Sequence, residues 1–175
     1  KSIYSLTIGL ALACGVSDYS TEGPGVVIST VVPAYSSELS SIALKRCGDA
    51  ETMIDKVNVH RQNNGLYSLQ EDASLARVAQ IRSGDMASHD YFSHTSPDGE
   101  TAFTLMNNLG ISYHVAGENI ARNNSHPKEA LDVAFDGFRK SPGHNQNMLG
   151  KNFSKIGVGV AFSDGMCHYV QLFSD

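Results

Sequence analysis

The spacing of apolar residues predicts helices followed by a β-hairpin in the second two thirds of the chain. Apolar side chains recur every three or four residues, between capping or turn residues, over 49–63, 72–88, 101–109 and 127–138. The period changes to two in Ile156–Phe162 and again in 168–173, and Ser163-Asp164-Gly165 between them is typical of a hairpin turn. Helices that precede a hairpin indicate an α+β class instead of a repeated βαβ unit.

One face of the first predicted strand carries only small residues. The large side chains of this strand alternate with Gly157, Gly159 and Ala161. Successive side chains of a strand point to opposite faces, so these three residues share one face. We therefore expect a helix to lie close against that face of the sheet.

The first residues differ in composition from the rest. Lys1 precedes an apolar stretch, Ile3–Ala13, about half as long as the ~20 residues that span a bilayer and typical of a signal peptide. The sequence Ala11-Leu12-Ala13-Cys14 resembles a bacterial lipoprotein processing site, in which Cys14 would be acylated. A plain signal peptide with an incidental cysteine is the alternative. Either reading predicts an extracytoplasmic protein.

The domain organisation follows from these patterns. We predict a signal peptide over residues 1–14 and a tether over 15–48, which is rich in Ser, Thr, Gly and small apolar residues. Within the tether, Val26–Val32 is the one segment expected to be extended. A single folded domain is expected over residues 49–175.

Composition and charge narrow the classes of partner. The chain has 175 residues, of which 41% are hydrophobic and 18% are charged, as in soluble globular proteins. Its net charge of −5 and the absence of a basic run exclude a nucleic-acid ligand. We expect a monomer that contacts a membrane only through an N-terminal lipid anchor.

The cysteine count is consistent with export. The chain has three cysteines, and removal or acylation of Cys14 leaves Cys47 and Cys167. In an oxidising compartment these two could form one disulfide, and two buried free thiols are the alternative. Because there is no Cys-x-x-Cys pair, a cysteine-type zinc cluster is excluded.

Five short motifs in order give the chain a family resemblance. They are Tyr91-Phe92-Ser93-His94, Ser96-Pro97-Asp98-Gly99, Ala116-Gly117-Glu118-Asn119-Ile120-Ala121, Ser141-Pro142-Gly143-His144-Asn145-Gln146-Asn147 and Ile156-Gly157-Val158-Gly159-Val160. The string resembles the CAP superfamily of cysteine-rich secretory, antigen 5 and pathogenesis-related 1 proteins, and is most similar to its compact bacterial branch. The resemblance covers about residues 50–173. It implies an exported α-β-α sandwich with a central antiparallel sheet.

The resemblance also implies a cleft that contains His94, Glu118 and His144. These residues lie 24 and 26 positions apart, so their spacing alone does not bring them together. Two neutral imidazoles and a carboxylate suit Zn²⁺ or another divalent cation, and His94 and His144 are the expected metal ligands. The second acidic residue of the family site would come from the helix before Ser141, which offers Asp132 and Asp136, with Asp136 as the candidate for the cleft.

Three functions follow from this set of residues. The first is a non-catalytic binding module that presents the cleft, with or without a metal, to an unidentified ligand. The second is a metal-dependent hydrolase of peptides or envelope polymers, with Glu118 as the candidate catalytic residue. The third is the binding of a lipid or sterol, as in some members of the superfamily. Common catalytic signatures such as Gly-x-Ser-x-Gly and His-Glu-x-x-His are missing, so the sequence favours the binding module.

Overall fold

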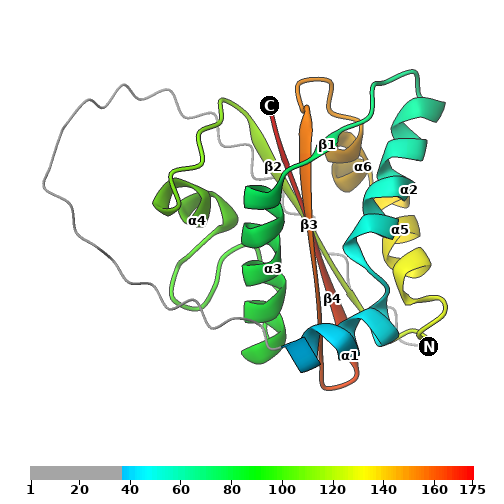
Figure 1. The fold of residues 1–175 in the computed structure, drawn as a ribbon, viewed down its shortest axis with the longest axis vertical. Helices are drawn as coiled ribbons and strands as arrows, with labels where there is room; N and C mark the ends of the chain where they lie inside the picture. The colour runs from blue at the N-terminus through cyan, green and yellow to red at the C-terminus, as the bar shows by residue number, and fades with distance from the viewer. Residues whose placement is uncertain (1–36) are drawn as a thin grey trace, which may run out of the picture.

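A computed structural model describes residues 37–175, which fold into three layers. The elements in chain order are α1 (Ser37–Cys47), α2 (Ala50–Asn63), β1 (Gln70–Glu71), α3 (Ala73–Ser88), α4 (Ala102–Asn108), β2 (Ala116–Asn123), α5 (Ala130–Lys140), α6 (Pro142–Met148), β3 (Lys155–Ser163) and β4 (Met166–Ser174). Figure 1 views the sheet on edge, with α3 and α4 on one side and α2, α5 and α6 on the other. The predicted α+β class and α-β-α sandwich are confirmed.

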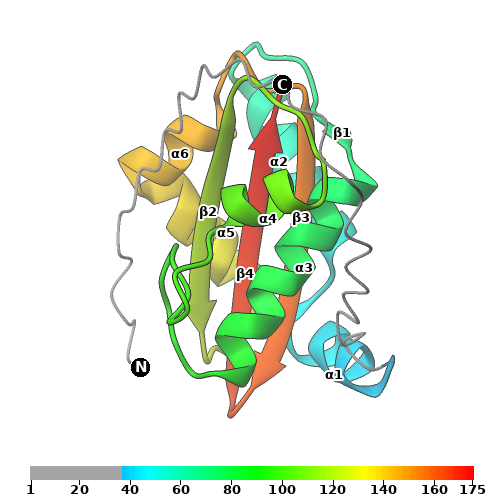
Figure 2. The ribbon, with the colours of Figure 1, turned by 90° about the vertical axis from the view of Figure 1, so that its left-hand side faces the viewer.

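The sheet has the strand order β1-β3-β4-β2, so that β2 forms one edge. Strand β4 pairs antiparallel with both β3 and β2, and Val170 lies opposite Gly159 on one side and Ile120 on the other. Only the two-residue strand β1 is parallel to its neighbour, β3. Figure 2 shows the sheet face, with α3 and α4 in front of it and α5 and α6 behind. The central sheet is therefore antiparallel apart from this short edge strand.

Each face of the sheet carries its own hydrophobic core. Tyr169 and Phe173 of β4 belong to the cluster that α1, α2 and α5 cover, whereas Val170 and Leu172 belong to the cluster beneath α3 and α4. This division follows from the alternation of side chains along a strand. The same alternation holds in edge strand β2: Ile120 belongs to the cluster beneath α3, and Ala121 belongs to the cluster on the opposite face.

Helix α3 lies directly against the small-residue face of β3, as the sequence predicted. A Cβ atom placed on Gly157 would be 2.2 Å from the backbone nitrogen of Ala76, and one on Gly159 would be 2.2 Å from the carbonyl group of Ala79. Gln80 of α3 reaches β3 as well, because its side-chain amide donates to Val160 O at 3.0 Å and accepts from Val160 N at 3.2 Å. The missing side chains thus let the helix backbone approach the strand.

The predicted helix starts are confirmed in three cases and shifted in a fourth. Asp49, Asp72 and Thr101 are the N-caps of α2, α3 and α4. The helix expected from Pro127 begins at Ala130, after a turn. The preceding helix α5 ends at Lys140, and Pro142 begins the next helix, α6, since proline is suited to the first helical turn.

The folded part begins earlier than the sequence predicted. Residues 37–47 were assigned to the tether, but they form α1, whose Ala43 and Cys47 are buried. The predicted signal peptide, Cys14 and the remainder of the tether lie outside the described residues. None of the helices between residues 37 and 175 has the length and apolar composition needed to cross a bilayer.

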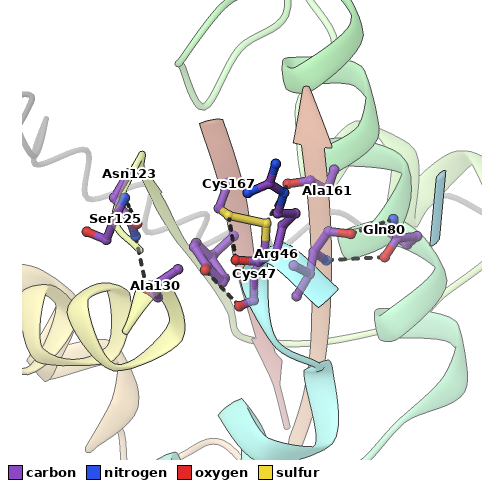
Figure 3. Close-up of a disulfide and its surroundings, with 10 residues drawn as sticks. Arg46, Cys47, Gln80, Asn123, Ser125, Ala130, Ala161 and Cys167 are labelled. Atoms are coloured by element: carbon purple, nitrogen blue, oxygen red, sulfur yellow. Dashed lines mark hydrogen bonds between the residues drawn. A yellow bond between two sulfur atoms is a disulfide. The ribbon is translucent and has the colours of Figure 1, made fainter. Parts of the chain in front are cut away.

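A disulfide joins α1 to the last strand. Cys47 and Cys167 are bonded across 120 positions of sequence, and Figure 3 shows the bond between the end of α1 and β4. The hydroxyl of Tyr169 donates to the carbonyl oxygen of Cys47 at 2.8 Å, which fixes the same helix end. The pairing expected from the cysteine count is confirmed, and the alternative of two free thiols is wrong.

Candidate functional site

The imidazole of His94 contacts the carboxylate of Glu118. Glu118 lies on edge strand β2, and His94 lies in the segment between α3 and α4. His94 Nδ1 is 2.5 Å from Glu118 Oε2, and the Glu118 side chain is 1% exposed. Because a carboxylate accepts this hydrogen bond, a neutral His94 carries its proton on Nδ1 and its lone pair on Nε2. His94 Nε2 is buried and has no hydrogen-bond partner among the described residues.

The other oxygen of the Glu118 carboxylate faces a buried arginine. Arg82 Nε lies 3.5 Å from Glu118 Oε1, and both side chains are 1% exposed. Arg82 also donates to the Tyr91 hydroxyl at 2.7 Å and to the Ser93 carbonyl oxygen at 2.8 Å. Arg82 was not predicted as a site residue because it lies within the apolar stripe of α3. A charged residue in such a stripe was the signal that could have identified it.

His144 is a buried, uncharged imidazole at the start of α6. Its ring packs edge-on against Phe138 with the centroids 5.3 Å apart. Burial lowers the pKa of His144 to about 4, and the positive charge of a protonated His94 acts in the same direction. Neither ring nitrogen of His144 has a hydrogen-bond partner within residues 37–175. At neutral pH this side chain therefore offers a lone pair.

Side-chain amides hold α6 against strand β2. Asn119 Nδ2 donates to the carbonyl oxygen of His144 and to Gln171 Oε1, both at 3.0 Å. Asn147 Nδ2 donates to Asn119 Oδ1 at 2.9 Å and to the backbone oxygen of Glu118 at 3.3 Å. The bond of Asn119 to the His144 carbonyl oxygen fixes the position of His144.

The two histidines reach edge strand β2 from different layers of the sandwich. The segment with His94 follows α3, whereas His144 belongs to α6, which packs on the other face of the sheet. The charge of a protonated His94 contributes, after burial, to lowering the pKa of His144. Among residues 37–175, no three His, Cys, Asp or Glu side chains are grouped as ligands of one metal ion. The contacts of Glu118 instead suit it to orient His94.

The candidate acidic residue Asp136 makes its contacts on the surface of α5. Its side chain is 48% exposed and pairs with Arg139 at 3.1 Å and with Lys140 at 3.2 Å. These two cations also lower the pKa of Asp136. Within residues 37–175, no contact joins Asp136 to His94, Glu118 or His144. Its ion pairs lie on the exposed surface of its own helix.

A further histidine has a partner beside the site. The Nε2 atom of His60 in α2 lies 2.8 Å from Asn145 Oδ1, and its ring packs edge-on against Phe135. Asn145 directly follows His144 in α6. His60 thus contributes to the packing of α6 from the α2 side.

Comparisons with known proteins agree with this architecture. The chain is 40% identical over 111 residues to YkwD of Bacillus subtilis (strain 168), an uncharacterized protein, and the match covers 63% of this chain and 42% of YkwD. A crystal structure of an extracellular SCP-domain protein from Bacillus anthracis str. Ames has a TM-score of 0.68 and 29% identity, and covers 87% of this chain and 45% of that one.

An outer surface protein of Borrelia burgdorferi has the same fold, with a TM-score of 0.64 and 20% identity over 71% of this chain and 90% of its own. The chain spans less than half the length of the two Bacillus proteins. The model of the CAP family, described as the cysteine-rich secretory protein family, matches residues 54–173. This chain therefore belongs to the CAP family of cysteine-rich secretory proteins.

Proposed function

We propose that this chain is an extracytoplasmic, non-catalytic binding domain whose His94 and His144 hold a divalent cation, with Zn²⁺ as the best match. The observation that carries the proposal is the set of three buried imidazole nitrogens, His94 Nε2 and both ring nitrogens of His144, that have no partner among the described residues. Buried polar atoms normally have a hydrogen-bond partner. Each neutral imidazole offers one lone pair, and two such lone pairs suit a bound cation.

The chemistry of the donor set fits this cation. Neutral imidazole is a common zinc ligand, and a histidine ligand usually donates its other ring N–H to a carboxylate that fixes the tautomer. The contact of His94 Nδ1 with Glu118 Oε2 is of this kind. A cation bound here would supply a positive charge to an anionic group of the ligand. With two protein ligands, the other coordination positions would be open to water or to that group.

The environment of Glu118 supports a binding role over the hydrolase alternative. A general base must accept a proton from substrate or water, so its carboxylate has to be accessible. One oxygen of Glu118 is taken by His94 and the other faces the Arg82 guanidinium, and the side chain is 1% exposed. A buried carboxylate whose two oxygens face His94 and Arg82 is suited to orienting the His94 ring.

Two observations support a location outside the cytoplasm. The Cys47–Cys167 disulfide is of a kind that persists in oxidising compartments. Relatives with the same fold include an extracellular protein of B. anthracis and an outer surface protein of B. burgdorferi. The apolar stretch Ile3–Ala13, read as a signal peptide, agrees with both.

Titration calorimetry of the metal-free protein with Zn²⁺ tests the proposal. We expect one site in the wild type, at least tenfold weaker binding in His94→Ala and in His144→Ala, and no site in the double variant. His114→Ala is the matched control, because His114 has a 97% exposed side chain that pairs with Asp175. Heats that are identical in the wild type and the double variant would end the metal proposal.

Two further variants and a hydrolysis assay separate Zn²⁺ binding from catalysis. Glu118→Gln keeps the shape of the side chain but weakens its hold on His94, so we expect weaker Zn²⁺ binding. Asp136→Asn should bind Zn²⁺ as the wild type does, because the ion pairs of Asp136 within residues 37–175 are with Arg139 and Lys140 of its own helix. Chelator-sensitive hydrolysis of an envelope polymer that Glu118→Gln abolishes would favour the hydrolase instead.

A further inference from the structure

The guanidinium of Arg82 lies at the centre of a network that ends on His94. The side chain is 1% exposed and is among the largest that are fully buried between residues 37 and 175. It points from α3 toward the loop after that helix and toward strand β2, where its partners are Tyr91, Ser93 and Glu118. Two of these three partners act directly on His94.

The first of them is the backbone just before His94. Arg82 Nη2 donates to the Ser93 carbonyl oxygen at 2.8 Å, and this oxygen lies in the same planar peptide unit as the nitrogen of His94. Fixing the oxygen therefore fixes the plane from which the His94 side chain starts. The second partner is the Glu118 carboxylate, whose Oε1 faces Arg82 and whose Oε2 contacts His94 Nδ1.

The guanidinium is itself held by a second pair of groups. Its Nη1 donates to the Tyr91 hydroxyl at 2.7 Å and lies 3.8 Å from the carboxylate of Asp85. The Tyr91 hydroxyl donates in turn to the same carboxylate. Helix α3 thus supplies both Arg82 and the acid that orients it through Tyr91.

Stability alone is a poor reason for an arginine at this place. Desolvating a guanidinium is expensive, and replacing buried ion pairs with well-packed apolar residues is often neutral or stabilising. The position lies in the apolar stripe of α3, next to a core cluster that includes Val78, Ala79 and Met86. A planar group with several donors in fixed directions, however, can hold a carbonyl and a carboxylate at the same time.

We infer that Arg82 is the positioning residue of this site: it fixes the backbone and the carboxylate that together present His94 Nε2 as a lone pair. The inference rests on the proposed function, because the His94 lone pair is the one proposed to bind the cation. The state of the His94 ring can be measured without any metal. The two ideas can therefore fail separately.

Nitrogen-15 NMR of the histidine side chains in the full, metal-free chain tests the inference. In the wild type we expect His94 as the Nδ1–H tautomer with a slowly exchanging ring proton. In Arg82→Lys a single ammonium cannot reach all three partners, so we expect mixed tautomers and at least tenfold faster exchange of that proton. Arg77→Lys, on the exposed side of the same helix, should match the wild type.

Zn²⁺ titration of the same proteins gives the second readout. Arg82→Lys should bind at least tenfold more weakly than Arg77→Lys. If Zn²⁺ does not bind the wild type but Arg82→Lys still changes the tautomer, the metal proposal fails and the positioning role stands. An unchanged tautomer and unchanged exchange in folded Arg82→Lys would overturn the inference.

Tyr91→Phe keeps the test decisive if Arg82→Lys does not fold. It removes one acceptor of Arg82 and leaves the guanidinium in place. We expect the His94 ring proton to exchange several-fold faster than in the wild type, with the fold intact by near-ultraviolet circular dichroism. Wild-type exchange in folded Tyr91→Phe would contradict the network.

Discussion

Gly159 of β3 lies in direct contact with the backbone of Ala79 in α3. A Cβ atom on Gly159 would be 2.2 Å from both the carbonyl carbon and the carbonyl oxygen of Ala79. This separation is far below van der Waals contact, and the neighbour is backbone, which cannot rotate away. The distance between α3 and the sheet is therefore set by the absence of a side chain at this position.

Gly159→Ala should accordingly destabilise the fold strongly. Overpacking a core costs about 1–3 kcal/mol when side chains can adjust, and here helix α3 itself would have to shift. We expect a loss of at least about 3 kcal/mol in the free energy of unfolding, measured by urea denaturation. Gly65→Ala is the control, because no atom lies within 4 Å of its Cβ position. Its positive φ of 72° should cost only about 1 kcal/mol.

A buried histidine outside the site should make stability depend on pH. Burial lowers the pKa of His168 to about 4 from its ordinary value of 6.5, with the charge of Arg122 acting in the same direction and Asp90 opposing it. Between these values the unfolded chain binds a proton that the folded chain does not. Stability is therefore complete above about pH 6.5 and is lost as the pH falls toward about 4.

The expected size of this effect follows from the shift. At about 1.4 kcal/mol per pKa unit, His168 should account for a loss of about 3 kcal/mol across the window. His144, whose pKa is also lowered to about 4, should add a similar slope. Urea denaturation of the wild type and His168→Gln across this pH range checks the prediction. Equal slopes in the two proteins would show that His168 does not titrate on unfolding.

The amide of Asn119 should be needed to keep α6 on the sheet. Asn119→Ala removes its bonds to the His144 carbonyl oxygen, Gln171 and Asn147 and leaves buried polar atoms without partners. We expect a loss of about 1–3 kcal/mol and faster amide hydrogen exchange in α6 than in α3. Asn58→Ala is the comparison, since its bonds to the Leu69 backbone are also partly buried but distant in sequence from α6. Equal exchange of α6 in both variants would refute this role.

Removing the disulfide should destabilise the domain without changing its fold. A closed loop of this length restricts the unfolded chain by about 4–5 kcal/mol in the chain-entropy estimate. The double variant Cys47→Ala/Cys167→Ala should lose that amount in urea denaturation, and the reduced wild type should match it. A double variant as stable as the oxidised wild type would show that the bond constrains little.

The regular elements could be predicted because their signals are local. Helix caps such as Asp49 and Asp72 precede apolar stripes, and the alternation at Gly157 and Gly159 fixes a strand and its helix-facing side. Helix α1 was not predicted, although Leu39, Ile42, Ala43 and Cys47 recur at helical spacing, because this short segment follows residues rich in Ser, Thr and Gly and was grouped with them. Its position depends on a bond to Cys167, far along the chain.

The site could be predicted only in part, because contacts between distant residues carry it. The resemblance gave His94, Glu118 and His144, and the structure supplies a direct contact between the first two. The roles of Arg82 and Asn119 depend on which atoms meet across β2. The spacing of residues along the chain does not show which side chains are in contact, so the sequence could not assign roles to Arg82 and Asn119.

The Cys47–Cys167 bond has a consequence for cleavage of the backbone. Every element from α2 to β3 lies inside one covalently closed ring, which includes the segment between α2 and β1 with Tyr67, a residue that is 94% exposed. A protease that cuts once in this segment leaves both pieces attached, so the nicked domain migrates as one chain until a reductant is added. The sheet and the two histidines would stay together after such a cut.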